Sequence, residues 1–164
     1  MRQRRIGSPL AAALLLAGVL LMTGARAASA QGALPAFPRA EVEVRAAGGN
    51  YRFAVEVAAT PLHRERGFMF RTELAPDAGM LFVHEAEREV AMWMKNTLIP
   101  LDMLFLAADG TIVRIEESTE PLSLRTISSG APVKGVLELP GGTSRRLGIV
   151  PGDRVVHSAF AAGG

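Results

Sequence analysis

Short runs in which apolar and polar residues alternate recur along most of the chain, and this period of two predicts strands rather than helices. The alternation is clearest at residues 41–44 and 51–57, and the sequence 48–50 between them, Gly-Gly-Asn, is typical of a turn. Further apolar runs of strand length follow at 80–83, 90–96, 101–107, 111–117, 134–139 and 154–157. The chain is therefore predicted to consist mainly of short strands joined by turns.

Residues 61–66 carry the signals of one short helix. Thr60 suits an N-cap, because its hydroxyl accepts a hydrogen bond from a free backbone N–H, and Pro61 suits the first helical position. Gly67 suits the position after the last turn. Long helices do not alternate with the strands, which argues against a parallel α/β sheet. The pattern favours a mainly-β fold, either a compact single-domain β-sandwich or a barrel, with one short helix.

The first 30 residues differ from the rest of the chain. Arginines at positions 2, 4 and 5 precede an apolar run at 10–22, and the small residues Ala28 and Ala30 precede Gln31. This order is typical of a secretory signal peptide, with cleavage expected after Ala30. The apolar run is shorter than the ~20 residues that cross a bilayer. We therefore expect a periplasmic or secreted protein with no membrane association after cleavage.

The predicted organisation is a signal peptide at 1–30, a flexible lead-in at 31–40, a single mainly-β domain at 41–158 and a frayed tail at 159–164. Loss of the leader removes four arginines and no acidic residue, so the formal net charge changes from +2 to −2. No basic run remains, which argues against nucleic-acid binding. The chain has no cysteine, which excludes disulfides and thiol chemistry.

Residues 91–105 hold the most distinctive chemistry of the chain. They contain its only tryptophan, Trp93, and two charged residues, Lys95 and Asp102, within an apolar stretch. Strand-length runs flank residues 97–100, which predicts an antiparallel hairpin with a four-residue loop. The register of that hairpin would set Lys95 opposite Asp102.

A second hairpin is expected to follow, because Asp109-Gly110 is a strong signal for a two-residue turn. Its register would place Leu104 opposite Ile115, Leu106 opposite Val113 and Asp102 opposite Glu117. One face of the three-stranded meander would then carry Trp93 beside a lysine and two carboxylates. Two close carboxylates repel each other, so one would have a raised pKa unless Lys95 compensates.

This cluster supports the hypothesis of a binding module for a small ligand. Trp93 would stack on a planar or sugar-like molecule, and Lys95, Asn96, Asp102 and Glu117 would supply polar contacts. In the alternative hypothesis the protein is a structural or protein-interaction domain. Trp93 is then a core residue, and the lysine and aspartate form a surface ion pair worth roughly 0–1 kcal/mol.

Two further hypotheses use other residues. Met92 and Met94 would share one strand face with Met103 opposite, and thioethers bind Cu(I), so a periplasmic Cu(I) or related metal carrier is an alternative to methionines that fill core gaps. An acid/base glycan hydrolase would need Asp102 and Glu117 about 5–10 Å apart. No nucleotide-binding, nucleophile-elbow or zinc-protease motif occurs, so no cofactor is expected, and a binder is favoured over an enzyme.

Basic residues surround the end of the expected helix. Arg64, Arg66 and Arg71 fit a solvated helix face, and an anion-binding role is the second interpretation.

Several motifs together resemble one known family. The most specific is the block 92–103, Met-Trp-Met-Lys-Asn-Thr-Leu-Ile-Pro-Leu-Asp-Met, and further motifs lie at 66–71, 79–82, 110–113, 137–142 and 148–153. With them the chain is similar, from about residue 42 to residue 156, to bacterial and archaeal proteins that contain the "domain of unknown function 192". The resemblance implies a compact, mainly-β and often exported domain, and it implies no established activity. It adds Arg66 and Glu138 to the candidate ligand-binding residues, because both lie in matching motifs.

Overall fold

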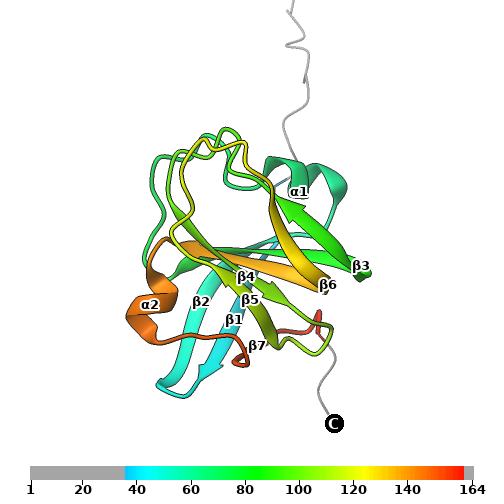
Figure 1. The fold of residues 1–164 in the computed structure, drawn as a ribbon, viewed down its shortest axis with the longest axis vertical. Coiled ribbons are helices and arrows are strands. Elements are labelled where there is room, and N and C mark those ends of the chain that lie inside the picture. The colour runs from blue at the N-terminus through cyan, green and yellow to red at the C-terminus, as the bar shows by residue number, and fades with distance from the viewer. Residues whose placement is uncertain (1–35, 161–164) are drawn as a thin grey trace, which may run out of the picture. The chain divides into compact units, whose positions relative to one another are not determined.

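The computed structural model describes residues 36–160, and the predicted leader, the start of the lead-in and the end of the tail lie outside this range (Figure 1). The elements of the described range, in chain order, are β1 (Arg39–Ala46), β2 (Gly49–Ala58), α1 (Pro61–Arg66), β3 (Ala78–Met92), β4 (Leu101–Leu106), β5 (Ile112–Glu116), β6 (Ile127–Pro140), α2 (Thr143–Leu147) and β7 (Arg154–Val156). The predicted mainly-β class is confirmed, with α2 as a second short helix. No helix among residues 36–160 is long and apolar enough to cross a membrane.

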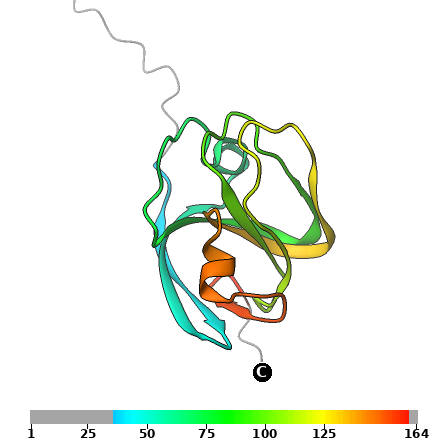
Figure 2. The same cartoon turned by 60° about the vertical axis from the view of Figure 1, so that its left-hand side comes forward.

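The strands form one sheet in the order β5-β4-β6-β3-β2-β1-β7, in which only the β2–β3 pair is parallel. The sheet curls into a half-barrel (Figure 2). Its two end strands are joined at a seam, where Thr111 bridges Arg154 and the Val155 N–H donates to the Gly110 carbonyl at 2.8 Å. Gly110 is required there, because its φ is 87° and a Cβ would lie 2.1 Å from the Val155 oxygen.

The predicted hairpin between residues 90–96 and 101–107 is wrong. β3 ends at Met92, and β6 lies between β3 and β4, so that Leu137 of β6 is opposite Leu81 on one side and Leu104 on the other. The run 134–139 is apolar enough to be buried on both faces, and such a strand belongs in the centre of a sheet. The β4–β5 hairpin is present with Leu104 opposite Ile115, as predicted, but a bulge sets Leu106 opposite Ile112.

Both faces of the central strands are buried, which explains why every residue of β4 is buried and all but Asp102 are apolar. Leu104, Leu137 and Leu139 point into the curled sheet, where they pack with residues such as Val42 and Phe53. The alternate residues form a second core on the outer face of the sheet, made of Met80, Phe82, Met103, Phe105, Val136 and their neighbours. That outer core needs a cover, which α1 and the loops supply.

Two parts of the chain cover the outer core, one on each side of β6. On one side, Thr60 caps the start of α1, where its hydroxyl accepts a hydrogen bond from the His63 N–H at 3.2 Å, and the chain then buries Phe68 against the sheet. On the other side, residues 93–100 cross the same face after β3 ends. The Phe70 N–H donates to the Asn96 carbonyl at 2.8 Å and so links the two sides.

Two ends of the predicted domain differ from expectation. β1 begins at Arg39, inside the predicted lead-in, and Phe160, inside the predicted tail, packs in the inner core. The ordered structure therefore extends further at both ends than the sequence pattern indicated.

Candidate functional site

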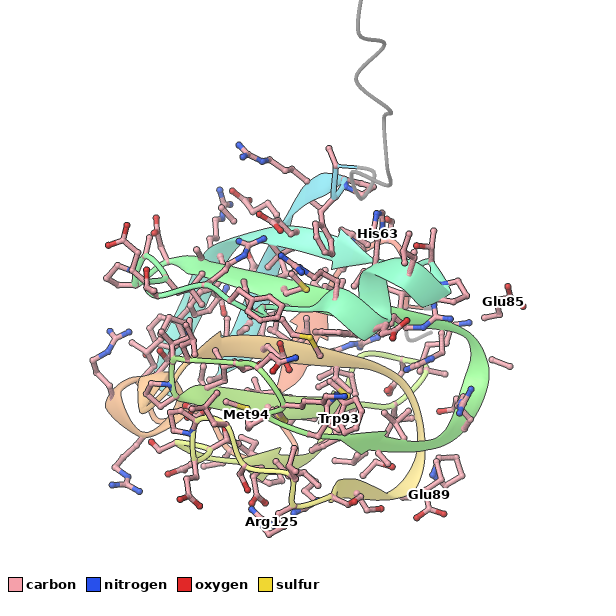
Figure 3. All side chains as sticks on the ribbon, turned by 90° about the horizontal axis from the view of Figure 1, so that it is seen from above. His63, Glu85, Glu89, Trp93, Met94 and Arg125 are labelled. Carbon is pink, nitrogen blue, oxygen red and sulfur yellow. The ribbon has the colours of Figure 1, made fainter. Side chains whose placement is uncertain are left out.

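A groove lies between α1 and the segment 91–97, with β6 beneath it. In the view of Figure 3, α1 with His63 and the segment with Trp93 lie on either side of β6. The deepest part of this α1 groove has a volume of about 80 Å³. Its lining residues are Arg64, Glu65, Arg66, Gly67, Phe68, Met69, Phe82, Ala91, Met92, Trp93, Lys95, Thr97 and Glu138.

The groove widens on both sides of this deep part. One end, of about 300 Å³, extends to Leu62 and Asn96. The other end, of about 280 Å³, extends to His84 and Arg88. Glu65 and Trp93 border all three spaces, so the three lie next to one another along the α1 groove.

Glu138 forms the floor of the deep part. It stands on the outer face of β6 between Met80 of β3 and Met103 of β4, and it is 4% exposed. Its carboxyl group makes no hydrogen bond or ion pair with any residue in the range 36–160. Burial raises the pKa of Glu138 to about 8, because the charged form loses its hydration in an apolar setting. Glu138 is therefore largely protonated at pH 7.

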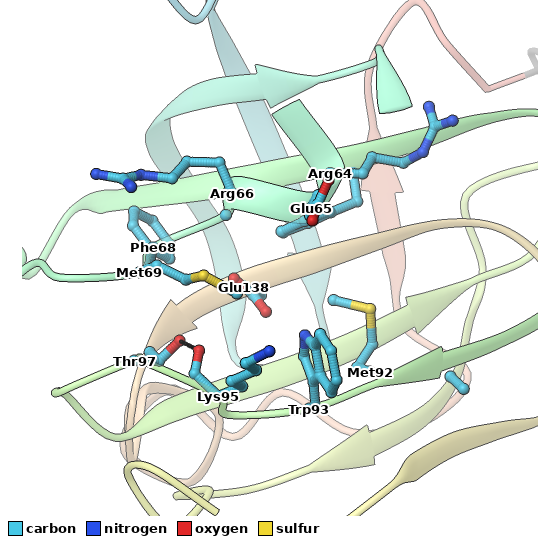
Figure 4. A pocket seen from close by; sticks show the side chains of 13 residues that line it. Arg64, Glu65, Arg66, Phe68, Met69, Met92, Trp93, Lys95, Thr97 and Glu138 are labelled. Atoms are coloured by element: carbon cyan, nitrogen blue, oxygen red, sulfur yellow. Dashed lines mark hydrogen bonds between the residues drawn. The ribbon is translucent and has the colours of Figure 1, made fainter. Parts of the chain in front are cut away.

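Trp93 and Lys95 stand at the rim of the groove. The Trp93 side chain is 47% exposed, and the Lys95 Nζ lies 5.0 Å from its ring centroid. An exposed cation–π contact of this kind contributes about 0.5–1 kcal/mol. Figure 4 shows the Lys95 ammonium group, the Trp93 ring and the Glu138 carboxyl pointing into the same space. The groove thus combines an aromatic face, a cation and a protonated acid.

Asn96 and Arg66 shape the wider end. Asn96 has a φ of 58°, a left-handed conformation that asparagine tolerates better than most residues. Its carbonyl binds the Phe70 N–H, and its side-chain Nδ2 lies 3.7 Å from the Met69 sulfur. The Arg66 guanidinium carbon lies 4.8 Å from the centre of the Phe70 ring. Both residues therefore line the groove.

Asp102 does not belong to the groove. β4 alternation puts it on the inner face with Leu104, and it is fully buried. Its carboxylate accepts backbone N–H bonds from Ser118 at 2.8 Å, Gly142 at 2.8 Å and Ser144 at 2.7 Å. Asp102 therefore fixes the start of α2 and the loop after β5, rather than facing Lys95.

Glu117 also lies away from Trp93. Its carboxylate binds the Arg145 guanidinium of α2 at 2.9 Å on the surface. The predicted face that combined Trp93 and Lys95 with Asp102 and Glu117 is therefore wrong, because β4 and residues 92–96 are not paired. The structure brings together Trp93, Lys95, Asn96, Arg66 and Glu138 and leaves out the other two.

The three methionines of the metal hypothesis have different surroundings. Met94 is 1% exposed, and its sulfur accepts a hydrogen bond from the Thr119 hydroxyl at 3.1 Å. Met103 is fully buried in the outer core, and Met92 reaches the groove wall. Within residues 36–160 no group of three histidine, aspartate or glutamate residues is placed to hold a metal ion.

Several lining residues were not among the predicted contacts. Glu65, His84 and Arg88 are in this group, and their sequence context is that of ordinary exposed charged residues. Arg64 and Arg66 were predicted as a possible anion-binding group together with Arg71. The structure places the first two at the groove and pairs Arg71 with Glu56 instead.

Comparisons with known proteins agree with this geometry in fold and leave the function open. The model of the DUF192 family, described as "Uncharacterized ACR", matches residues 42–157. A crystal structure from Sinorhizobium meliloti 1021, described as a "putative transcription regulator", is 46% identical with a TM-score of 0.75, covering 78% of this chain and 100% of its own. No curated protein matches the chain.

A second crystal structure is similar over the same region. It is described as a protein of unknown function from Novosphingobium aromaticivorans DSM 12444, and it is 35% identical with a TM-score of 0.72. The match covers 77% of this chain and 94% of that one.

Proposed function

The chain belongs to the uncharacterised DUF192 family, and on the chemistry of the α1 groove we propose that it is a binding module for a small ligand that has a flat face and hydrogen-bonding groups. A sugar ring or a planar heterocycle has this chemistry. The observation that carries the proposal is the Glu138 carboxyl, which is buried without a protein partner at the floor of the groove.

A carboxyl that has no protein partner and faces a groove can give its hydrogen bonds to a ligand there. A ligand that pairs with this carboxyl gains these hydrogen bonds in a mostly buried, apolar setting. Protonated Glu138 offers one O–H donor and one carbonyl acceptor, which complement a hydroxyl or amide that both donates and accepts. The requirement for such a group is the main source of specificity in the proposal.

Trp93 supplies the second part of the recognition. Nearly half of its side chain is exposed beside Glu138, and large exposed aromatics are suited to stacking on flat ligand faces. Lys95 lies over the same ring and adds a donor at the rim. The exposed position of Trp93 also means that its removal should not unfold the protein.

Thermal unfolding of the purified protein at pH 7 against sugars, cell-wall fragments, nucleotides and metals tests the proposal. A ligand at 100 times its Kd stabilises the folded state by about 2.7 kcal/mol. We expect Trp93→Ala and Glu138→Leu to remove the shift and Glu138→Gln to retain part of it, since an amide still donates and accepts. Arg52→Gln is the matched control, because the Arg52 side chain is exposed on β2, away from the groove.

Two results would count against a ligand-binding groove. One is the absence of a shift with every compound of the panel. The other is a shift that survives both Trp93→Ala and Glu138→Leu. A shift with Cu(I) that requires Met92 and Met94 would favour the metal-carrier hypothesis instead.

We also propose, from the leader alone, that the protein is exported and meets its ligand outside the cytoplasm. The regulator description of the Sinorhizobium relative finds no support in this sequence, because no long run of basic residues follows residue 30.

A further inference from the structure

β3 is interrupted where it passes the groove. Val83 is opposite Gly135 and Arg88 is opposite Val133, so four residues of β3 face the single residue Lys134 of β6. Figure 3 shows the β3 ribbon turning between Glu85 and Glu89. Bulges of this kind redirect side chains and are common beside functional sites. Here the bulge directs both His84 and Arg88 to the end of the α1 groove.

Arg64 and Arg88 line this end of the groove, and Lys134 is a third cation close to His84. Arg64 of α1 donates to the Val83 carbonyl at 3.1 Å, which holds its guanidinium group beside β3. Lys134 donates to the Glu85 carbonyl across the bulge. Arg88 is exposed and makes no ion pair with any residue of the described range. A guanidinium has five N–H donors, so Arg64 and Arg88 retain donors for a ligand.

The pKa of His84 is affected by the positive charges of these cations. Its Nε2 is buried and has no hydrogen-bond partner among residues 36–160. Burial lowers the pKa of His84, and the charges of Arg64, Arg88 and Lys134 lower it further. Such an electropositive site is suited to an anion. An anion would accept hydrogen bonds from the free guanidinium N–H groups and would offset the positive charges around His84.

Acidic residues nearby do not neutralise this cluster by direct pairing. The Glu87 carboxylate accepts from the Ala108 N–H at 2.8 Å, and the Glu89 carboxylate accepts from the Ser128 hydroxyl at 3.0 Å. Glu65 lines the same end of the groove and forms no ion pair with Arg64 or Arg88.

We infer that Arg64, His84 and Arg88 form a subsite for an oxyanion, such as a phosphate, sulfate or carboxylate group. The space of this subsite adjoins the one that holds Glu138, and Trp93 lines both. If the proposed function holds, the natural ligand is therefore a sugar or planar ring that carries an anionic group. The ring would rest at Trp93 and the anion at Arg88.

The first experiment uses inorganic phosphate, sulfate and acetate with the purified protein at constant ionic strength, with chloride as the balancing anion. Binding is measured by the His84 imidazole signals in proton NMR and by the melting temperature. A bound oxyanion offsets the neighbouring cations, so we expect the pKa of His84 to rise. We expect Arg88→Gln to weaken phosphate binding at least 5-fold, and the distal Arg52→Gln to leave it unchanged.

Trp93→Ala separates this inference from the proposed function, because a free oxyanion needs no stacking face. Phosphate binding that is unchanged in Trp93→Ala and lost in Arg88→Gln supports the subsite, even if no ring ligand binds the groove. The inference is overturned if none of the three oxyanions moves the His84 signals. It is also overturned if Arg52→Gln weakens phosphate binding as much as Arg88→Gln.

Discussion

Asp102 and Glu138 lie on neighbouring strands one position out of register, and their carboxyl groups face opposite sides of the sheet. Asp102 is opposite Leu139, whereas Glu138 is opposite Met103. Because successive side chains on a strand alternate between faces, Asp102 points into the curled sheet and Glu138 points out to the groove. The first meets three backbone N–H donors, and the second meets none among the described residues. Two buried acids thus have opposite roles, one structural and one available to a ligand.

Glu138→Gln should change how stability depends on pH. The pKa of Glu138 is about 8 in the folded state, above its ordinary value of 4.5, so between these values the unfolded state binds fewer protons than the folded state. The free energy of unfolding therefore falls by up to about 1.4 kcal/mol per pH unit as the pH rises from about 4.5 to about 8, and is constant above.

Glutamine does not titrate, so the variant should gain stability relative to the wild type across that window. Urea unfolding of both proteins at pH 4.5, 6, 7.5 and 9 measures the difference. Parallel stability profiles of the two proteins would show that Glu138 ionises normally and would remove the argument for a protonated acid in the groove.

Asp102→Ala should destabilise the protein by about 3 kcal/mol or more, because three backbone N–H groups lose a charged acceptor. Glu117→Ala is the matched control and should cost about 0–1 kcal/mol, since its pair with Arg145 is on the surface. Denaturant unfolding gives both values. Equal losses in the two variants would contradict the structural role of Asp102, and so would a folded Asp102→Ala protein with weakened binding in the groove.

Gly110→Ala should open the seam between β5 and β7. The added Cβ would meet the Val155 oxygen at 2.1 Å, so we expect a loss of about 3 kcal/mol or more and faster hydrogen exchange of the Val155 amide. Gly130→Ala is the control, because Gly130 has a φ of 71° but no atom within 4 Å of the added Cβ. Its expected cost is about 1–2 kcal/mol, from the backbone alone. If Gly110→Ala lowers the free energy of unfolding no more than Gly130→Ala does, the half-barrel is open at this seam.

Cleavage of the leader should leave Gln31 as the first residue of the exported protein. Mass spectrometry of the protein from a periplasmic or secreted fraction checks this directly. Ala30→Leu should block or displace cleavage, because the site requires a small residue. Recovery of the intact chain in the cytoplasm alone would contradict the proposed export.

The sequence by itself determined the strand content, the short helix at 61–66 and the hairpin that sets Leu104 opposite Ile115. These features depend on side-chain alternation, a capping threonine and an Asp-Gly turn, which act over a few residues. The family resemblance also brought Arg66 and Glu138 into the candidate set, although nothing in their local sequence distinguished them.

Only the tertiary structure decided which carboxyl belongs with Trp93 and Lys95. β6 begins at Ile127, well after the end of β3 at Met92, and it pairs between β3 and β4. This pairing turns Asp102 to the inner face of the sheet and places Glu138 under the groove. Local pattern cannot reveal such an insertion, because the pairing of strands depends on which apolar faces are buried together across the whole sheet. The same long-range packing gathers Arg64, His84 and Arg88, from a helix and the two sides of a bulge, at one end of the groove.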